Sequence, residues 1–203
     1  MISISNLTKI FEDNIIFEKL NINIESGEYI IFSGKSGCGK TTLLNMIGGL
    51  EPFNEGSIII DGIDISNKRN HLKFFGEKVG FLFQNFALIE NKTVRENLEM
   101  VKKSNRTNTS IEDALKSVGL LEKIDNKIYS LSGGEQQRVA LSRLMIKKCD
   151  IILADEPTGS LDSENAIKVL EILEDLWREG KTLILVTHDE KIKMRGKRLI
   201  NLC

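Results

Sequence analysis

The run GKSGCGKT, from Gly34 to Thr41, gives the clearest indication of the fold of this chain. It fits the pattern GxxxxGK(S/T), in which glycines let backbone amides curl around a phosphate group. In that pattern Lys40 meets the β and γ oxygens of a nucleotide and Thr41 binds magnesium. An apolar run, Tyr29 to Ser33, precedes the loop, and a helix-like run, Thr41 to Ile47, follows it. The order strand, loop, helix predicts a phosphate site at the positive amino end of a helix.

A second run, IILADE from Ile151 to Glu156, reads as an apolar strand that ends in two carboxylates. At the carboxyl edge of a parallel sheet these groups lie beside the phosphate loop. Asp155 would then hold magnesium through water, and Glu156 would polarise the water that attacks the phosphoryl group. Read alone, such an acidic pair is more often a helix cap or a solvated turn, and only the phosphate loop favours the metal site.

The remaining patterns divide the chain into a core and an insert. Residues with period two near the amino end, and the run SIIIDGIDI from Ser57 to Ile65, predict an antiparallel sheet in the first third. The apolar run Leu183 to Val186 predicts a second central parallel strand. Strand signals fade between Asn85 and Lys148, where Thr109 and Glu112 have capping-box spacing. We therefore predict one α/β domain over residues 1–203, with an insert of helices at 85–148 and a core with its β subdomain at 1–84 and 149–203.

Composition limits the partners and the location of the chain. Its 28 basic and 29 acidic side chains leave a net charge of -1, so no overall field draws it to nucleic acid. No apolar run approaches the ~18 residues that cross a bilayer, and the amino end lacks a secretory signal, which predicts a cytosolic protein. The three cysteines contain no CxxC pair and are expected to be free thiols. Cys38 lies at a helix amino end, a setting that lowers the pKa of a thiol.

The run LSGGEQQR, from Leu131 to Arg138, predicts a second anion site in the same chain, because a hydroxyl and two glycines again open a helix. One ATP needs only one phosphate loop. This run is similar to the signature of ABC-transporter ATPases. Other motifs of that family follow in the correct order, so the resemblance covers nearly the whole chain.

The resemblance implies a P-loop NTPase (RecA-like) core with an antiparallel β subdomain and a helical subdomain insert. It also implies that ATP and Mg²⁺ are sandwiched between the phosphate loop of one copy and the signature of a second copy, in a head-to-tail dimer. Ser132, Gly133, Gly134 and Glu135 would close over the γ-phosphate held by the partner copy.

Four further positions match family motifs. Phe11 matches the aromatic residue that stacks on adenine, with Phe17 as the alternative, and Gln84 matches a glutamine that touches magnesium and water. Asp162, in the run Ser160-Leu161-Asp162, matches a loop that crosses the dimer seam, although it also suits a simple helix cap. His188 matches the histidine that contacts the γ-phosphate, whereas the other histidine, His71, lies in no motif.

The expected site residues fall into three groups. The catalytic residues are Glu156, His188 and Gln84. The metal ligands are Thr41, Gln84 and Asp155. The nucleotide-binding residues are Phe11, Gly34, Lys35, Ser36, Gly37, Cys38, Gly39, Lys40, Thr41, Thr42, Ser132, Gly133, Gly134, Glu135 and Asp162.

The sequence looks most similar to the branch of lipoprotein-release, macrolide-export, antimicrobial-peptide and cell-division ATPases. This implies an ATPase that energises separate membrane permease subunits from the inner face of the membrane, in an exporter of peptide or lipophilic substrates. A cell-division-type ATPase that signals without transport stays open as the alternative. The membrane subunits are expected to dock beside Gln84 and the helical insert, with Leu88, Ile89 and Leu98 as candidate contacts. Two interpretations are weaker. A soluble ABC protein needs tandem cassettes or a long coiled-coil insertion, and this chain has neither. A plain P-loop kinase leaves the run LSGGEQQR unexplained.

Overall fold

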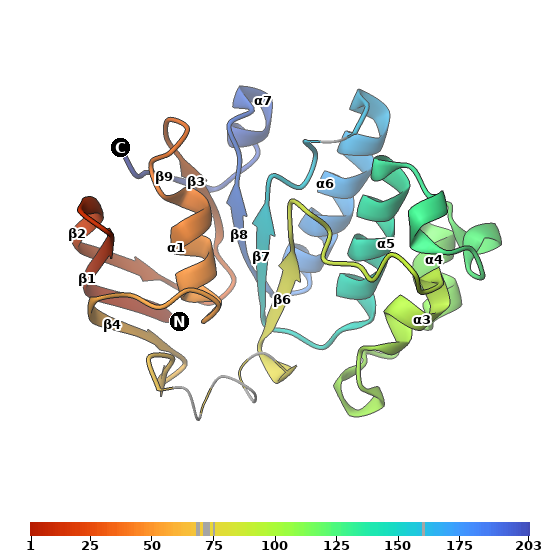
Figure 1. The fold of residues 1–203 in the computed structure, drawn as a ribbon, viewed down its shortest axis with the longest axis horizontal. Helices are drawn as coiled ribbons and strands as arrows, with labels where there is room; N and C mark the ends of the chain where they lie inside the picture. Colours follow the sequence, from red (N-terminus) through yellow and green to blue (C-terminus); the bar gives the residue numbers. More distant parts are fainter. Residues whose placement is uncertain (68–69, 71–73, 75, 160) are drawn as a thin grey trace.

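The computed structural model describes residues 1–67, 70, 74, 76–159 and 161–203. Figure 1 shows a parallel sheet at the centre of the molecule with helices on both sides. His71 and Ser160, which the sequence analysis considered, lie outside the described residues.

A five-stranded parallel sheet forms the core. Its order is β6 (Val79–Leu82), β7 (Ile151–Asp155), β8 (Thr182–Val186), β3 (Tyr29–Ser33) and β9 (Arg198–Asn201). The two apolar runs expected to be central parallel strands are β7 and β8, and they pair with each other in parallel. Continuous apolar runs suit such strands because both faces of the sheet are covered.

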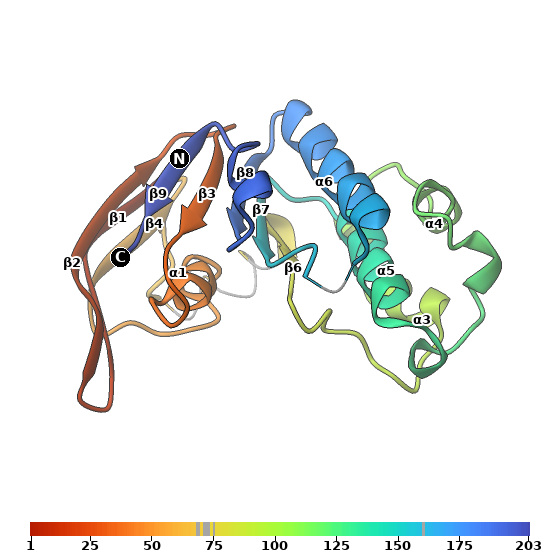
Figure 2. The same cartoon turned by 90° about the horizontal axis from the view of Figure 1, so that it is seen from above.

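Alternate residues of the central strands enter two different hydrophobic clusters, as the period-two geometry of a strand requires. In β7, Ile152 and Ala154 pack with α5 (Gly133–Ile146) and α6 (Ser163–Arg178), whereas Ile151 and Leu153 pack on the other face with α1 (Lys40–Ile47). Figure 2 shows the resulting layers, with α1 between the two sheets and with α5 and α6 beyond the parallel sheet.

The antiparallel sheet expected in the first third is present. Its order is β2 (Asn14–Ile24), β1 (Ile2–Phe11), β4 (Glu55–Ile60) and β5 (Ile63–Asp64). The run about Asp61 and Gly62 forms the hairpin between β4 and β5, with Ile60 paired to Ile63.

The stretch from 85 to 148 contains α3 (Val94–Glu99), α4 (Ile111–Ser117) and α5, together with the 3-10 turns η1 (Lys103–Asn105), η2 (Leu121–Lys123) and η3 (Ile128–Ser130). The expected cap of α4 is wrong by one residue, because Ser110 rather than Thr109 accepts from the amide of Asp113. Both pairs have the right spacing, and the burial of Ile111, Ala114 and Leu115 decides between them.

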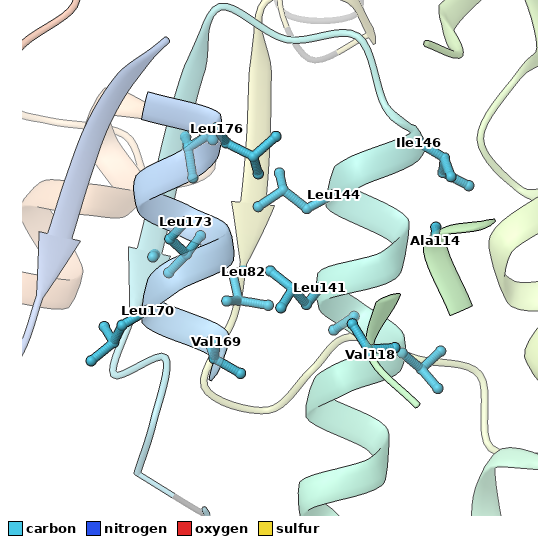
Figure 3. Close-up of a cluster of buried hydrophobic side chains, with 14 of the residues drawn as sticks. Leu82, Ala114, Val118, Leu141, Leu144, Ile146, Val169, Leu170, Leu173 and Leu176 are labelled. Carbon is cyan, nitrogen blue, oxygen red and sulfur yellow. The ribbon is translucent and has the colours of Figure 1, made fainter. Parts of the chain in front are cut away.

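Helices α5 and α6 pack side by side on the parallel sheet. Figure 3 shows Leu141 and Leu144 of α5 meeting Leu173 and Leu176 of α6, with Leu82 of β6 behind them. Full burial of each leucine contributes roughly 1.5–3 kcal/mol to folding. The short α7 (Glu190–Lys193) follows β8. Within the described residues, none of the helices is long and apolar enough to span a membrane.

Candidate active site

The phosphate loop connects the end of β3 to α1. Gly34, Gly37 and Gly39 all have positive φ, at 145°, 84° and 86°, which only glycine adopts without strain. A Cβ on Gly39 would also lie 2.4 Å from Cγ2 of Ile16, so the loop passes directly against β2. Among the described side chains none caps the start of α1, and its first turn contains no acidic residue. The first amides of α1 are therefore available to an anion.

The side chain of Lys40 lies inside the loop. Its Nζ donates to the carbonyl oxygens of Gly34 at 2.9 Å and Lys35 at 2.8 Å, and the residue is 9% exposed. This places a positive charge among the loop amides, where a phosphate would be bound. Its contact with the β and γ oxygens of a nucleotide stays a prediction.

Thr41 and Asp155 meet at the edge of the sheet. Thr41 Oγ1 donates to Asp155 Oδ1 at 3.1 Å, and Asp155 is the buried last residue of β7. Burial raises the pKa of Asp155, the hydrogen bond from Thr41 lowers it, and the charge of Glu156 raises it. A hydroxyl and a buried carboxylate next to a phosphate site fit Mg²⁺, which prefers oxygen ligands and completes its shell with water and phosphate.

Glu156 and His188 come together from two neighbouring strands. Glu156 follows β7, His188 follows β8 by two residues, and His188 Nδ1 lies 2.8 Å from Glu156 Oε1. An ionised carboxylate only accepts, so the neutral imidazole can donate to Glu156 in the tautomer with its proton on Nδ1. Thr187 Oγ1 also donates to Glu156 Oε2, at 3.4 Å. Glu156 has a φ of 46°, a costly backbone conformation of the kind that accumulates at functional sites.

Gln84 is an exposed residue two positions beyond the end of β6. Because Leu82 pairs with Ala154, the chain leaves β6 beside the two carboxylates that end β7. The geometry therefore brings Gln84 to the same sheet edge as Asp155 and Glu156. Its contact with magnesium or water stays a prediction.

Arg143 of α5 holds the turn that follows Gln84, a feature that the sequence analysis missed. Its guanidinium donates to the carbonyl oxygens of Phe86 at 2.8 Å and Ala87 at 2.5 Å. Both turn residues have positive φ, at 61° and 46°. Burial lowers the pKa of Arg143, which indicates a desolvated cation that those carbonyls must satisfy. Sequence spacing carries no signal for this contact, since its partners are backbone atoms far along the chain.

The two candidates for adenine stacking differ in exposure. Phe11 ends β1, is 43% exposed and has Lys9 Nζ 4.1 Å from its ring centroid. Phe17 is buried, and its ring would lie 2.7 Å from a Cβ on Gly39. Stacking needs an accessible ring face, so the structure removes Phe17 as the alternative. The stacking role of Phe11 stays a prediction.

The signature run begins α5 with a complete capping box. Ser132 Oγ accepts from the amide of Glu135 at 3.3 Å, and the Glu135 carboxylate accepts from the amide of Ser132 at 2.8 Å. Lys123 forms an ion pair with Glu135, and this pair is the first cause of the lowered pKa of Glu135. Gly133 is exposed, and a Cβ there would meet nothing within 4 Å. This helix start is exposed at Ser132 and Gly133, and the capping box engages the amides of Ser132 and Glu135.

Within one chain, the two glycine-rich helix starts, those of α1 and α5, lie far apart. The residues of α1 pack in the cluster on one face of the parallel sheet, and those of α5 pack in the cluster on the other face. Figure 2 shows α1 and α5 separated by that sheet. The geometry thus joins Lys40, Thr41, Asp155 and Glu156 into one site and leaves Ser132 outside it.

Two other expectations concern single residues. Asp162 is the exposed cap of α6 and accepts from the amide of Asn165 at 2.9 Å, as the simpler interpretation predicted. Its role at a dimer seam stays a prediction.

The expected low pKa of Cys38 is wrong, because burial and the neighbouring Cys203 thiol raise it, against the opposing charge of Lys40. All three cysteines are free thiols, as expected.

Comparisons with known proteins agree with this geometry. The family model described as ABC transporter matches residues 17–159. The chain is 39% identical over its whole length to the macrolide export ATP-binding/permease protein MacB of Campylobacter jejuni, and it spans 33% of that protein. It is 36% identical to the uncharacterized ABC transporter ATP-binding protein YvrO of Bacillus subtilis, over 98% of this chain and 92% of YvrO.

Solved structures match over almost the entire chain. A dimeric structure of MJ0796, described as a bacterial ABC transporter cassette, superposes with a TM-score of 0.89 at 37% identity, over 99% of this chain and 94% of that one. A dimeric post-hydrolysis state of MJ0796 bound to ADP and Pi has a TM-score of 0.88 at 35% identity, with the same coverage.

Proposed function

Because the chain belongs to the ABC transporter family and is one of its ATPases, we propose that it energises separate membrane subunits of an exporter of peptide or lipophilic substrates. In this proposal two copies bind ATP between them head to tail, close, and reopen after hydrolysis. The cell-division-type alternative shares the same catalytic site, and the macrolide export relatives favour export over signalling.

The proposed catalytic mechanism rests on the contact between Glu156 and His188. Glu156 directly follows Asp155, which accepts a hydrogen bond from Thr41. Phosphoryl transfer to water needs positioning and charge neutralisation more than covalent chemistry. Glu156 is the carboxylate that would accept the proton of the attacking water, and His188 would orient that carboxylate and the γ-phosphate. Products are ADP, inorganic phosphate and the released proton.

The residues of the loop would hold the triphosphate. Amides of the loop and of the first turn of α1 would donate to the phosphate oxygens, and Lys40 would exchange its two carbonyl partners for the β and γ oxygens. Thr41, Asp155 and Gln84 would hold Mg²⁺, which supplies neutralisation of the phosphate charge when bound. Phe11 would stack on the adenine.

A second copy is needed because the signature lies on the far side of the sheet from the phosphate loop. With Ser132 and Gly133 facing outward, a partner copy turned head to tail can present them to the γ-phosphate. The dimeric cassettes of similar fold support the assembly of two copies. Asp162, exposed at the cap of α6, would then lie near the seam.

The docking site for the membrane subunits would be a cavity of about 630 Å³ between β6 and the helical insert. Phe83, Ala87, Met100 and Arg143 line it, and Met100 is 58% exposed. Arg143 connects this wall to the turn after Gln84, so movement at the nucleotide would reach the docked subunit. The chain spans 33% of the macrolide export ATP-binding/permease protein of Campylobacter jejuni.

Only one of the three contact residues expected from the sequence remains a strong candidate. Ile89 is 41% exposed, Leu88 packs partly buried against the core, and Leu98 is completely buried. The expectation for Leu98 is therefore wrong. Leu98 belongs to the inward face of α3, a distinction that requires knowing where that short helix begins.

The test is the variant Glu156→Gln, which keeps the shape of the side chain and removes its basicity. We expect ATP hydrolysis to fall by about 100-fold or more, as for loss of a general base. Size-exclusion chromatography should show a dimer that persists with Mg-ATP and dissociates without it. Glu179→Gln, an exposed glutamate just beyond the end of α6, is the matched control. Undiminished hydrolysis in Glu156→Gln would remove Glu156 as the base.

The same variant tests the partner. Tagged Glu156→Gln with Mg-ATP, incubated with detergent-solubilised membranes, should copurify a polytopic membrane protein in stoichiometric amount. Arg143→Met should weaken that copurification while the isolated chain still binds ATP. Recovery of soluble proteins alone would count against the membrane assignment.

A further inference from the structure

Two of the three cysteines come together beside the phosphate loop. A Cβ built on Gly34 would lie 2.6 Å from Cys38 Sγ and 2.8 Å from Cys203 Sγ, so both sulfur atoms flank the same point. The sequence separates these residues widely, and Cys149 is buried apart from them in the cluster around α5. Only the fold makes Cys38 and Cys203 neighbours.

Strand β9 holds Cys203 in this position. It pairs in parallel with β3, the strand that leads into the phosphate loop, with Ser33 opposite Asn201. Beyond the strand, the amide of Leu202 donates to Ser33 O at 3.0 Å, and the amide of Cys203 donates to Asn201 Oδ1 at 3.3 Å. Figure 2 shows this last segment beside the loop that enters α1. The approach of the two thiols is therefore fixed by the sheet.

We propose that Cys38 and Cys203 form a reversible disulfide that locks the phosphate loop and blocks ATP binding. This inference rests on the proposed function, because it regulates the same site. Cys38 is a residue of the loop itself, and its Sγ lies 3.9 Å from Lys40 Nζ. A covalent link from Cys38 to a strand edge prevents the loop from adjusting around a triphosphate and holds Lys40 on its carbonyl partners.

The reaction needs a two-electron oxidant, for which hydrogen peroxide is sufficient. The exposed Cys203 thiol loses its proton and its sulfur attacks a peroxide oxygen as the O–O bond breaks. The leaving hydroxide takes up that proton, which gives a sulfenic acid and one water. Cys38 then loses its proton and attacks that sulfur, the S–S bond forms, and the hydroxyl group leaves as the second water. Two thiols lose two electrons and two protons, and a dithiol reductant reverses the step by exchange.

Reactivity of the pair depends on pH in a defined direction. Burial raises the pKa of Cys38, the nearby Cys203 thiol adds to the rise, and Lys40 opposes it. Cys38 therefore rests as a thiol at neutral pH and reacts second, after the exposed Cys203 has been oxidised. Closure of the disulfide should become faster as the pH rises.

The experiment uses the purified chain, reduced with dithiothreitol or oxidised with hydrogen peroxide. Peptide mapping of the oxidised protein should recover a Cys38–Cys203 linked pair within one chain. Binding of a fluorescent ATP analogue should weaken at least about tenfold on oxidation and recover on reduction. Saturating Mg-ATP present during oxidation should slow formation of the link.

Two variants separate the disulfide from other oxidation. Cys203→Ser should bind the analogue like the reduced wild type and should keep that affinity after peroxide. Cys149→Ala should behave like the wild type in both states. An oxidised wild type with the linked peptide but unchanged affinity, or with links only between chains, would overturn the inference. A reduced wild type that fails to bind the analogue would instead overturn the proposed function.

Discussion

The two glycine-rich helix starts of this chain look alike in sequence and differ in how their backbone amides are satisfied. Helix α1 begins at a glycine with a left-handed backbone and no side-chain cap, and Lys40 turns back over the loop. Helix α5 begins at Ser132, whose hydroxyl and amide both bond to Glu135. The first start has no side-chain cap, whereas the second has the carboxylate of Glu135 bonded to its cap residue.

From this difference we infer that ATP binding and the pairing of two copies depend on different helix starts. An open helix start with a lysine inside its loop binds an anion without help from another molecule. In α5 the capping box occupies the amides of Ser132 and Glu135 and places a carboxylate beside them, which makes this start less favourable for an anion than the start of α1. We therefore expect α1 to supply most of the ATP affinity, and α5 to contribute only when a second copy closes over a nucleotide that is already bound.

The largest expected effect comes from Lys40→Ala. ATP affinity of the isolated chain should fall by about 100-fold or more, because hydrogen bonds to charged groups contribute roughly 1.5–3 kcal/mol each. Isothermal titration calorimetry with Mg-ATP measures it. The control is Lys35→Ala in the same loop, which removes an exposed side chain and keeps its backbone. Equal losses in the two variants would show that loop charge, and not the position of Lys40, determines affinity.

An intermediate effect is expected from Ser132→Arg. ATP affinity of the isolated chain should not change, whereas the ATP-dependent dimer of the Glu156→Gln background should weaken at least about tenfold, or roughly 1.4 kcal/mol. Analytical ultracentrifugation with Mg-ATP measures the dimer. Ser117→Arg, an exposed serine at the end of α4, is the control. Weaker ATP binding by the Ser132 variant alone would mean that α5 contributes to the site of its own chain.

A smaller effect is expected from Glu135→Ala, which removes the carboxylate of the α5 capping box. The free energy of unfolding should fall by about 1–2 kcal/mol, the range for a lost helix cap, because the ion pair with Lys123 is lost as well. Glu96→Ala removes the matching carboxylate from the capping box of α3, where Thr93 is the cap, and should cost less. Urea denaturation measures both. A greater loss in Glu96→Ala would contradict the importance given to Lys123.

The smallest effect is a pH dependence of that stabilisation. The pKa of Glu135 is lowered in the folded chain, first by Lys123, so folding is favoured by its ionised form. Its contribution is fully present above the unfolded pKa of about 4.3 and is lost as the pH falls through the lower folded value. The difference in thermal unfolding temperature between the wild type and Glu135→Ala should therefore shrink as the pH falls from neutral through that acidic range. A constant difference would place the stabilisation in packing instead.

Much of the fold could be predicted because each pattern is local. The strands β3, β7 and β8 coincide with continuous apolar runs, and the glycine pattern of Gly34 to Thr41 requires the loop that the structure contains. The carboxylates of Asp155 and Glu156 were expected at the sheet edge for the same reason, since a parallel strand has only one carboxyl end. Their roles in hydrolysis stay predictions.

Other features depend on atoms that are distant in the chain. Arg143 donates hydrogen bonds to the backbone carbonyl oxygens of Phe86 and Ala87. Every residue type has such a carbonyl, so the sequence gives no signal for these contacts. The cap of α4 falls at Ser110 because packing selects between two equivalent spacings. The raised pKa of Cys38 follows from burial and from Cys203, and the loop motif alone indicated the opposite direction.

The patterns in the sequence are enough to predict a nucleotide-binding loop and the strands of the core, and they predict that the second glycine-rich run serves a partner copy. Those conclusions rest on spacing over a few residues, where backbone geometry and residue type are sufficient. Three features became visible only in the folded chain: the contact of Glu156 with His188, the ion pair of Lys123 with the Glu135 carboxylate of the α5 capping box, and the approach of Cys203 to Cys38. Each of those depends on which strands and helices are neighbours, and pairing between distant segments is set by packing of the whole core.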